Sequence, residues 1–239
     1  MSVLIFYFRV FAITLWLFLT CLGVLLILPF RWGNPNGLQY FARTFGWGAL
    51  PLAGIRLKIE GRENLEVEPP AVFLGNHQSA MDMATFGAVR VPRCTVVIKK
   101  EVQWIPIVGQ MFMASAILID RKKGADAREA LKKAVALMKA KRASVGMFPE
   151  GTRNRTREGM LPFKKGAFHL AIEAQVPIVP IVCGSLNSLI DPKKKIFRGG
   201  ELRIRVLPPV STAGLTRDDL DSLIETVRSQ MLKTFEEIS

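Results

Sequence analysis

A histidine and an aspartate five positions apart are the residues of this chain best placed to do chemistry. His77 is one of two histidines among 239 residues, and Asp82 follows it. A histidine that a carboxylate orients can remove a proton from a hydroxyl group near neutral pH. On one continuous helix the two side chains would lie about 140° apart and could not meet. The pair is therefore useful only if a helix begins between them.

Ser79 is the residue expected to begin that helix. Serine is a favoured N-cap, and Asp82 three positions later fits the looser capping-box pattern. His77 would then lie in the loop between the helix and the apolar run 71–74, which is typical of a short buried strand. The pair alone leaves a plainer alternative open, in which Asp82 caps a helix beside an ordinary loop histidine.

A second candidate group, residues 148–153, follows another apolar run. Glu150, Gly151, Thr152 and Arg153 offer a carboxylate, a flexible backbone, a hydroxyl and a guanidinium in succession. Exposed N–H groups and an arginine fork suit an anionic oxygen. The same four residues could equally form an ordinary turn in a solvated basic loop.

Basic residues follow further apolar runs. Asp120 and Arg121 come after the run 116–119, and Lys100 comes shortly after the run 95–98. In an open α/β sheet the ligand crevice lies outside one set of strand ends, so these cations could face an anionic group. A surface Asp–Arg pair is the plainer interpretation of residues 120 and 121, and it would contribute little stability.

Composition narrows the class of protein. The net charge of +13 and the pI of about 10.1 favour a polyanionic partner, such as an anionic membrane or a phosphorylated substrate. No aromatic-and-basic recognition pattern accompanies the charge, so we predict no nucleic-acid partner. Three dispersed cysteines and two histidines exclude a disulfide framework and favour no metal site. The chain also lacks a nucleophile elbow and a phosphate loop.

The N-terminal region predicts membrane association. Residues 10–30 contain no charged side chain, and as a helix they would extend about 31 Å, enough to cross a bilayer core. The run is too long for a signal peptide and lacks a cleavage site, so we expect it to be retained. Residues 37–54 predict either an interfacial helix or a helix packed on the following domain. Arg31 and Arg43 place the rest of the chain in the cytoplasm.

Residues 55–239 alternate between strand-like and helix-like patterns. We expect one α/β domain there, with a mostly buried sheet flanked by helices, preceded by a membrane-associated helical region at 1–54. Pro177 and Pro180 cannot donate to a sheet ladder, so the run 176–182 is expected at an edge or in an irregular strand. The expected strands lie at 55–60, 71–74, 95–98, 116–119, 145–148, 176–182 and 203–206. The clearest helices are expected at 125–141 and from about 216 onward.

Four short blocks occur in one order along this domain and together resemble the glycerolipid acyltransferases. They match most closely the bacterial 1-acyl-sn-glycerol-3-phosphate acyltransferase family. A His-x4-Asp motif alone is a weak signal, but its pairing with Pro-Glu-Gly-Thr-Arg about seventy residues later is a strong one. The blocks are Asn76-His77-x4-Asp82, Ile119-Asp120-Arg121, residues 148–153 and residues 176–180.

The resemblance implies a mixed sheet and transfer of a fatty acyl group to the 2-hydroxyl of lysophosphatidic acid, giving phosphatidic acid. His77 would be the base and Asp82 the carboxylate that orients it. Arg153 would bind the acceptor's phosphate with help from Arg121, and we add Lys100 because of its charge and position. The third block would support the site: Glu150 would orient its loop, with Gly151 and Thr152, and N–H groups near Gly151 are candidates for the oxyanion site.

The implied co-substrate is an acyl-CoA or acyl carrier protein thioester, with no cofactor besides. Membrane lipids would be partners, at the cytoplasmic face of a bacterial cytoplasmic membrane. The resemblance favours insertion of two N-terminal helices into one leaflet, and one bilayer-spanning helix is the alternative. Two other functions remain open, namely acylation of a different lysolipid, such as a lyso-ornithine lipid, and lipid binding without catalysis.

Overall fold

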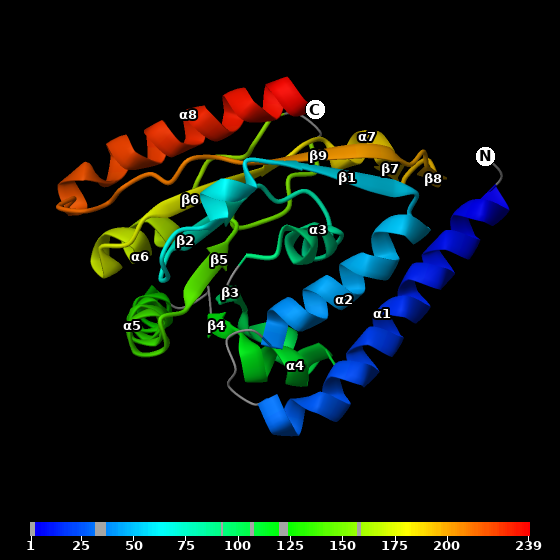
Figure 1. Cartoon of the computed structure of the whole chain (residues 1–239), viewed down its shortest axis with the longest axis horizontal. Helices are drawn as coiled ribbons and strands as arrows, with labels where there is room; N and C mark the ends of the chain where they lie inside the picture. Colours follow the sequence, from blue (N-terminus) through cyan, green and yellow to red (C-terminus); the bar gives the residue numbers. More distant parts are fainter. Residues whose placement is uncertain (1–2, 32–36, 92, 106–107, 120–123, 157–158) are drawn as a thin grey trace.

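A seven-stranded mixed sheet organises the chain (Figure 1). The computed structural model describes residues 3–31, 37–91, 93–105, 108–119, 124–156 and 159–239. The strand order is β1-β9-β6-β2-β5-β3-β4. These strands are β1 (Ile55–Glu60), β2 (Val72–Gly75), β3 (Cys94–Lys99), β4 (Ile117–Ile119), β5 (Ser144–Met147), β6 (Ile178–Cys183) and β9 (Gly200–Val206).

Helices cover both faces of this sheet, and a two-stranded ribbon lies beside it. The helices are α1 (Val3–Arg31), α2 (Gly37–Leu52), α3 (Asp82–Val89), α4 (Val108–Ser115), α5 (Gly124–Lys141), α6 (Gly166–Ala174), α7 (Leu186–Leu189) and α8 (Leu220–Ile238). Three 3-10 turns, η1 (Arg62–Leu65), η2 (Lys100–Trp104) and η3 (Arg217–Asp219), and the ribbon strands β7 (Ile190–Asp191) and β8 (Ile196–Phe197) complete the described elements.

The parallel part of the sheet brings the expected motifs together. Strands β6, β2, β5, β3 and β4 run parallel, so their carboxyl ends lie at one edge. β2 and β5 are direct neighbours, with Leu74 opposite Met147, and the loops that follow them therefore start side by side. We call this side of the sheet the catalytic edge. The predicted α/β class and mixed sheet are confirmed.

Of the two alternatives predicted for the run 176–182, the edge strand is wrong and the irregular strand is confirmed. β6 lies inside the sheet between β2 and β9, and all its residues are buried. The antiparallel pairing with β9 begins with Ile181 opposite Val206, so Pro180 falls just outside that ladder. Its carbonyl still accepts a hydrogen bond from Leu207 N–H at 2.9 Å. A proline is tolerated in this internal strand because the pairing on that side is interrupted at Pro180 and resumes only at the bridge between Ile178 and Val210.

Alternation along β2 separates two hydrophobic cores. Phe73 points to the side of α2 and α3, whereas Val72 and Leu74 point to the side of α6 and α8. This period of two is what a strand buried on both faces requires. Figure 1 shows α5, α6 and α8 on one side of the sheet and α1, α2 and α3 on the other.

α2 packs on the domain, which is one of the two alternatives predicted for residues 37–54. Phe41 and Phe45 are buried in the core, while Tyr40 and Trp47 are half or more exposed. The helix packs tightly on α3: a Cβ added to Gly87 would lie 2.1 Å from the carbonyl carbon of Ala42. The same helix thus packs on the domain and presents an aromatic face outward.

α1 extends along the same side of the molecule. Its Arg9 guanidinium donates to the carbonyls of Ala53 at 3.3 Å and Phe197 at 3.4 Å. Trp16 Nε1 lies 3.1 Å from the Thr44 carbonyl of α2. Most of the apolar surface of α1 nevertheless remains exposed. The segment Val3–Ile27 of this helix has a mean hydropathy of 2.6 and is 11% buried. By length and composition it is the one helix of the described residues that could cross a membrane.

Candidate active site

His77 and Asp82 meet as the spacing predicts. His77 lies in the loop after β2, α3 begins at Asp82, and His77 Nδ1 is 2.6 Å from Asp82 Oδ2. The predicted cap is wrong in detail, because the N-cap is Met81 rather than Ser79. The chain makes a turn between Ser79 and Met81 before the helix starts, and the Ser79 hydroxyl accepts a hydrogen bond from Met81 N–H at 3.2 Å.

The Asp82 carboxylate organises the whole loop. Besides the imidazole, Oδ2 accepts hydrogen bonds from the backbone N–H groups of Gln78 at 2.8 Å and Ser79 at 2.9 Å. Its side chain is 6% exposed and that of His77 is 21% exposed. A carboxylate only accepts, so it fixes the tautomer with a proton on Nδ1 and leaves the Nε2 lone pair of His77 available.

The imidazole ring is held on a second side by an aromatic ring. Phe148, directly after β5, stacks on His77 with 4.1 Å between centroids and 11° between planes. Gly75 makes room for this ring, since an added Cβ there would lie 3.2 Å from Phe148 Cε1. Because Asp82 fixes the orientation of the imidazole and Phe148 fixes its plane, the ring presents Nε2 in a single direction.

Two buried amides fasten this loop to the end of β6. Asn76 exchanges hydrogen bonds with the backbone of Cys183, both at 2.8 Å. Gln78 Nε2 donates to the carbonyls of Cys183 at 3.1 Å and Gly184 at 2.9 Å, and its Oε1 accepts from Leu186 N–H at 3.0 Å. These amides continue the pairing of β2 with β6 past the end of the strand. Sequence reasoning missed their role, because the partners lie more than a hundred residues away.

Glu150 joins the second loop to the first. One carboxylate oxygen accepts from His77 N–H at 2.7 Å and the other from Leu161 N–H at 2.9 Å. The side chain is 2% exposed, and burial raises the pKa of Glu150, against the effect of these hydrogen bonds. In addition Asn154 N–H donates to the His77 carbonyl at 2.7 Å. This geometry fits the expected orienting role of Glu150.

Gly151 adopts the left-handed conformation that favours glycine, with φ of 69°. Its N–H donates to the Phe148 carbonyl at 3.0 Å, so in this structure that group is not available to an oxyanion. Thr152 and Arg153 follow it on the surface and are exposed. The aliphatic stem of Lys164 covers the glycine, with Cε 3.0 Å from where a Cβ would be. Lys164 shortly precedes α6 in the sequence, and its position over Gly151 arises from the tertiary fold.

Two further cations, Lys100 and Arg121, are expected from the sequence to face the acceptor. Lys100 begins η2 directly after β3, at the catalytic edge, and is exposed. Arg121 lies outside the described residues. Within the described part of the chain, no three His, Cys, Asp or Glu side chains gather in a way that could hold a metal ion. The structure thus brings His77, Asp82 and Glu150 together and leaves the cations around them at the surface.

Comparison with known proteins agrees with this arrangement. The profile of the Acyltransferase family matches residues 56–184. A 1-acyl-sn-glycerol-3-phosphate acyltransferase of Saccharomyces cerevisiae is 40% identical over 199 residues, which are 82% of this chain and 65% of that protein. The alpha enzyme of Homo sapiens with the same name is 42% identical over 79% of this chain and 66% of its own. The chain thus spans slightly less than two thirds of these relatives. The beta enzyme of Homo sapiens is 35% identical over 86% of this chain and 73% of its own.

A solved structure has the same fold. The crystal structure of PlsC, the 1-acyl-sn-glycerophosphate acyltransferase from Thermotoga maritima, superimposes with a TM-score of 0.76 at 22% sequence identity. The match covers 99% of this chain and 96% of that one. The N-terminal helices are therefore included in the shared architecture.

Proposed function

This chain belongs to the acyltransferase family, and we propose that it transfers a fatty acyl group from a thioester to the 2-hydroxyl of 1-acyl-sn-glycerol-3-phosphate, forming phosphatidic acid. The observation that carries the proposal is the imidazole–carboxylate pair at 2.6 Å, held beside the Glu150 loop. The relatives named for this reaction support the choice of acceptor.

The His77 side chain acts as a general base. Nε2 takes the proton of the 2-hydroxyl while that oxygen attacks the thioester carbonyl, so no acyl-enzyme forms. The tetrahedral intermediate then collapses, the carbon–sulfur bond breaks, and the leaving thiolate recovers the proton from Nε2. Asp82 holds the tautomer and stabilises the imidazolium between these two steps. Because the Asp82 side chain is largely buried, its charge acts on the imidazole with little screening by water.

The acceptor's phosphate binds the cations at the catalytic edge. Arg153 has a fork of N–H donors that suits phosphate, and it follows the loop that Glu150 attaches to His77. Lys100 approaches from the end of β3, and Arg121 completes the set expected from the sequence. We add Lys164, because its stem crosses Gly151 and carries an ammonium group to the same loop. The acyl donor is acyl-CoA or acyl carrier protein, and the reaction needs no further cofactor.

The protein associates with a membrane through α1. Arg9, Phe6 and Tyr7 contact the domain along the N-terminal part of this helix, which keeps the helix beside the domain. If α1 crossed a bilayer, the basic residues around Phe197 would have to enter the hydrocarbon core with it. Insertion of the apolar face into one leaflet avoids that cost and keeps the catalytic domain on the cytoplasmic side of a bacterial membrane.

Acceptor assays on the purified protein test the function. We expect incorporation of label from an acyl thioester into lysophosphatidic acid, and a decrease of about 10²–10⁴-fold for His77→Ala with the melting temperature retained. Arg153→Ala should chiefly raise the KM for the acceptor. Turnover of another lysolipid with none of lysophosphatidic acid would contradict the proposed acceptor. Full activity of His77→Ala would contradict the mechanism.

A further inference from the structure

We propose that Trp104 and Ile105 at the end of η2, together with Met113 of α4, form a second membrane contact, through which the lysolipid acceptor enters the active site directly from an anionic bilayer. In the described part of the chain after α2, the large hydrophobic side chains that are exposed number three. They are Trp104 at 78%, Ile105 at 47% and Met113 at 42%, and all lie between η2 and the middle of α4. We call these three side chains the apolar tip.

Trp104 and Ile105 of the apolar tip lie at the catalytic edge. η2 starts directly after β3, and β3 runs parallel to β5, whose following loop carries Glu150. α4 packs against η2, α1 and α2, and Figure 1 shows it beside the C-terminal part of α1. The tip is therefore continuous with the apolar helix and close to the strands that position His77.

A bilayer, rather than a folded protein, is the occupant that this surface fits. The neighbouring α1 presents a largely apolar segment of 25 residues, Val3–Ile27, that remains mostly exposed and is longer than a local docking patch requires. Tryptophan favours the boundary between water and hydrocarbon, and α2 exposes Tyr40 and Trp47 nearby. Lys100 lies exposed at the base of the tip, where anionic headgroups would attract it, and Lys99 beside it pairs with Glu101 at 2.9 Å.

This placement gives the acceptor a route that avoids water. The acyl chain of lysophosphatidic acid prefers the bilayer, and each methylene group that leaves it raises the free energy. With the tip inserted, the phosphate and the free hydroxyl could reach the cations and His77 while the acyl chain stays among lipids. The acceptor's route rests on the proposed function, because it is measured by acyl transfer. The membrane contact itself does not.

The first experiment compares two acceptors on Trp104→Ala, Trp104→Phe and Gln110→Ala. Gln110 is an exposed polar residue of α4 and serves as the control from the same segment.

With a long-chain acceptor in vesicles of equal parts phosphatidylcholine and phosphatidylglycerol, we expect Trp104→Ala to raise the apparent KM about tenfold, because the burial of one large aromatic side chain is lost. Trp104→Phe should retain most activity and Gln110→Ala all of it. With a short-chain acceptor dissolved in water, all three should match the wild type. An equal loss on both acceptors would overturn the proposal in favour of a structural role for Trp104.

The second experiment needs no activity. Tryptophan fluorescence is measured on the full chain with the same vesicles, in which the phosphatidylcholine is brominated on its acyl chains. The difference in quenching between wild type and Trp104→Phe reports Trp104 alone, and we expect it to be quenched. An unquenched Trp104 would overturn the proposal. A second result would also overturn it: a wild-type dimer in sedimentation experiments that Trp104→Ala dissociates while vesicle binding stays unchanged. A second copy of the chain, rather than a bilayer, would then cover the tip. If wild type binds vesicles with Trp104 quenched but acylates no lysophosphatidic acid, the proposed function fails and the membrane contact stands.

Discussion

Basic residues gather at both edges of the parallel part of the sheet, and the two edges differ in what surrounds those charges. At the catalytic edge the central groups are buried and share hydrogen bonds. Asp82 is bonded to His77 and to two backbone N–H groups, and Glu150 connects the two loops. The polar groups therefore point at one another, and the imidazole that they hold is left with a free nitrogen facing outward.

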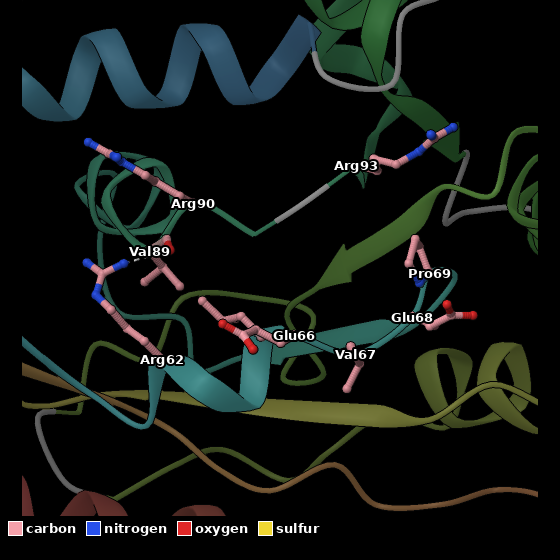
Figure 2. Close-up of a pocket in the computed structure, with 9 residues that line it drawn as sticks. Arg62, Glu66, Val67, Glu68, Pro69, Val89, Arg90 and Arg93 are labelled. Atoms are coloured by element: carbon pink, nitrogen blue, oxygen red, sulfur yellow. Dashed lines mark hydrogen bonds between the residues drawn. The ribbon is translucent and has the colours of Figure 1, made fainter.

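The opposite edge, at the amino ends of β2 and β3, has a cavity of about 630 Å³ (Figure 2). Arg62, Arg90 and Arg93 line it, but Figure 2 shows their guanidinium groups pointing in different directions. Arg62 donates to the Val89 carbonyl at the end of α3, at 3.5 Å, and Arg93 to the Lys141 carbonyl at 2.6 Å. These arginines satisfy helix ends rather than a common ligand.

The comparison teaches that side chains hydrogen-bonded to one another identify a site better than the volume of a cavity or the number of charges that line it. The cavity beside Arg62 is large and is lined by three arginines, yet these arginines are exposed, and Arg62 and Arg93 donate to separate carbonyls. The catalytic edge has an imidazole and a buried carboxylate 2.6 Å apart, an arrangement that is typical of acid–base catalysis.

Asp82→Asn removes the group on which the comparison depends most and should have the largest effect. An asparagine oxygen can still accept from the Gln78 and Ser79 N–H groups, but it no longer provides the charge that stabilises the imidazolium. We expect kcat to fall about 10²–10⁴-fold, because the favoured tautomer is lost as well. The measurement is acyl transfer to lysophosphatidic acid, with circular dichroism as the control for folding. A kcat near that of the wild type would show that the hydrogen-bonded cluster around Asp82 has no catalytic role.

Glu150→Gln tests the connection between the two loops. A glutamine has one accepting oxygen, so either the His77 or the Leu161 N–H loses its partner, and the resulting shift of His77 should lower activity by up to about 10²-fold. Stability provides a second readout. Because burial raises the pKa of Glu150, the folded chain binds that proton more tightly than the unfolded chain does.

The unfolding free energy of the wild type should therefore contain a component that falls as the pH rises from the usual glutamate value through the raised one. Urea titrations at a series of pH values should show this component in the wild type and not in Glu150→Gln. Identical pH profiles for the two proteins would indicate that Glu150 is not the group responsible, and would weaken the distinction between the edges.

The sequence predicts the local part of this site well. The meeting of His77 and Asp82 follows from one helix start, and the signals for that start lie within four residues of the pair. The α/β class and most strands also follow from local periodicity. The position of β6 does not, because the proline rule depends on where the neighbouring ladder ends, and that is decided by β9.

Long-range contacts account for the rest. Asn76 and Gln78 acquire their roles from the end of β6, and Lys164 from a glycine thirteen positions earlier that folds beneath it. Nothing in the spacing of these residues indicates the contact. Turn geometry also decides which N–H groups near Gly151 could serve an oxyanion, because it directs the N–H of Gly151 itself to the Phe148 carbonyl.

Lys164→Met should have a moderate effect that separates charge from packing. Methionine keeps an apolar stem over Gly151 and removes the ammonium group, so the loop should retain its shape. We expect the KM for lysophosphatidic acid to rise about tenfold, which corresponds to losing about 1.4 kcal/mol, near the value of a hydrogen bond to a charged group. The KM for a monoacylglycerol acceptor without phosphate should not change. Lys165→Met is the matched control, because that lysine pairs with Asp221 at 2.7 Å on α8.

Two results would contradict this role. Equal changes for both acceptors would mean that the lysine supports the loop rather than the phosphate. An effect of Lys165→Met as large as that of Lys164→Met would mean that only the general charge of the region matters.

Arg90→Gln should have the smallest effect, and it tests the other half of the comparison. Arg90 is exposed just after α3, at the edge opposite His77, and the same cavity contains the carboxylates of Glu66 and Glu68. Loss of one cation there leaves no buried group unpaired, so we expect kcat/KM to stay within about twofold and the unfolding free energy within about 0.5 kcal/mol. Assays side by side with Arg153→Ala make the contrast direct, since both variants remove one exposed arginine. If Arg90→Gln raised the acceptor KM as much as Arg153→Ala does, the phosphate would have to be bound at the opposite edge. His77 could not then reach the hydroxyl of the same molecule, and the distinction between the edges would have to be abandoned.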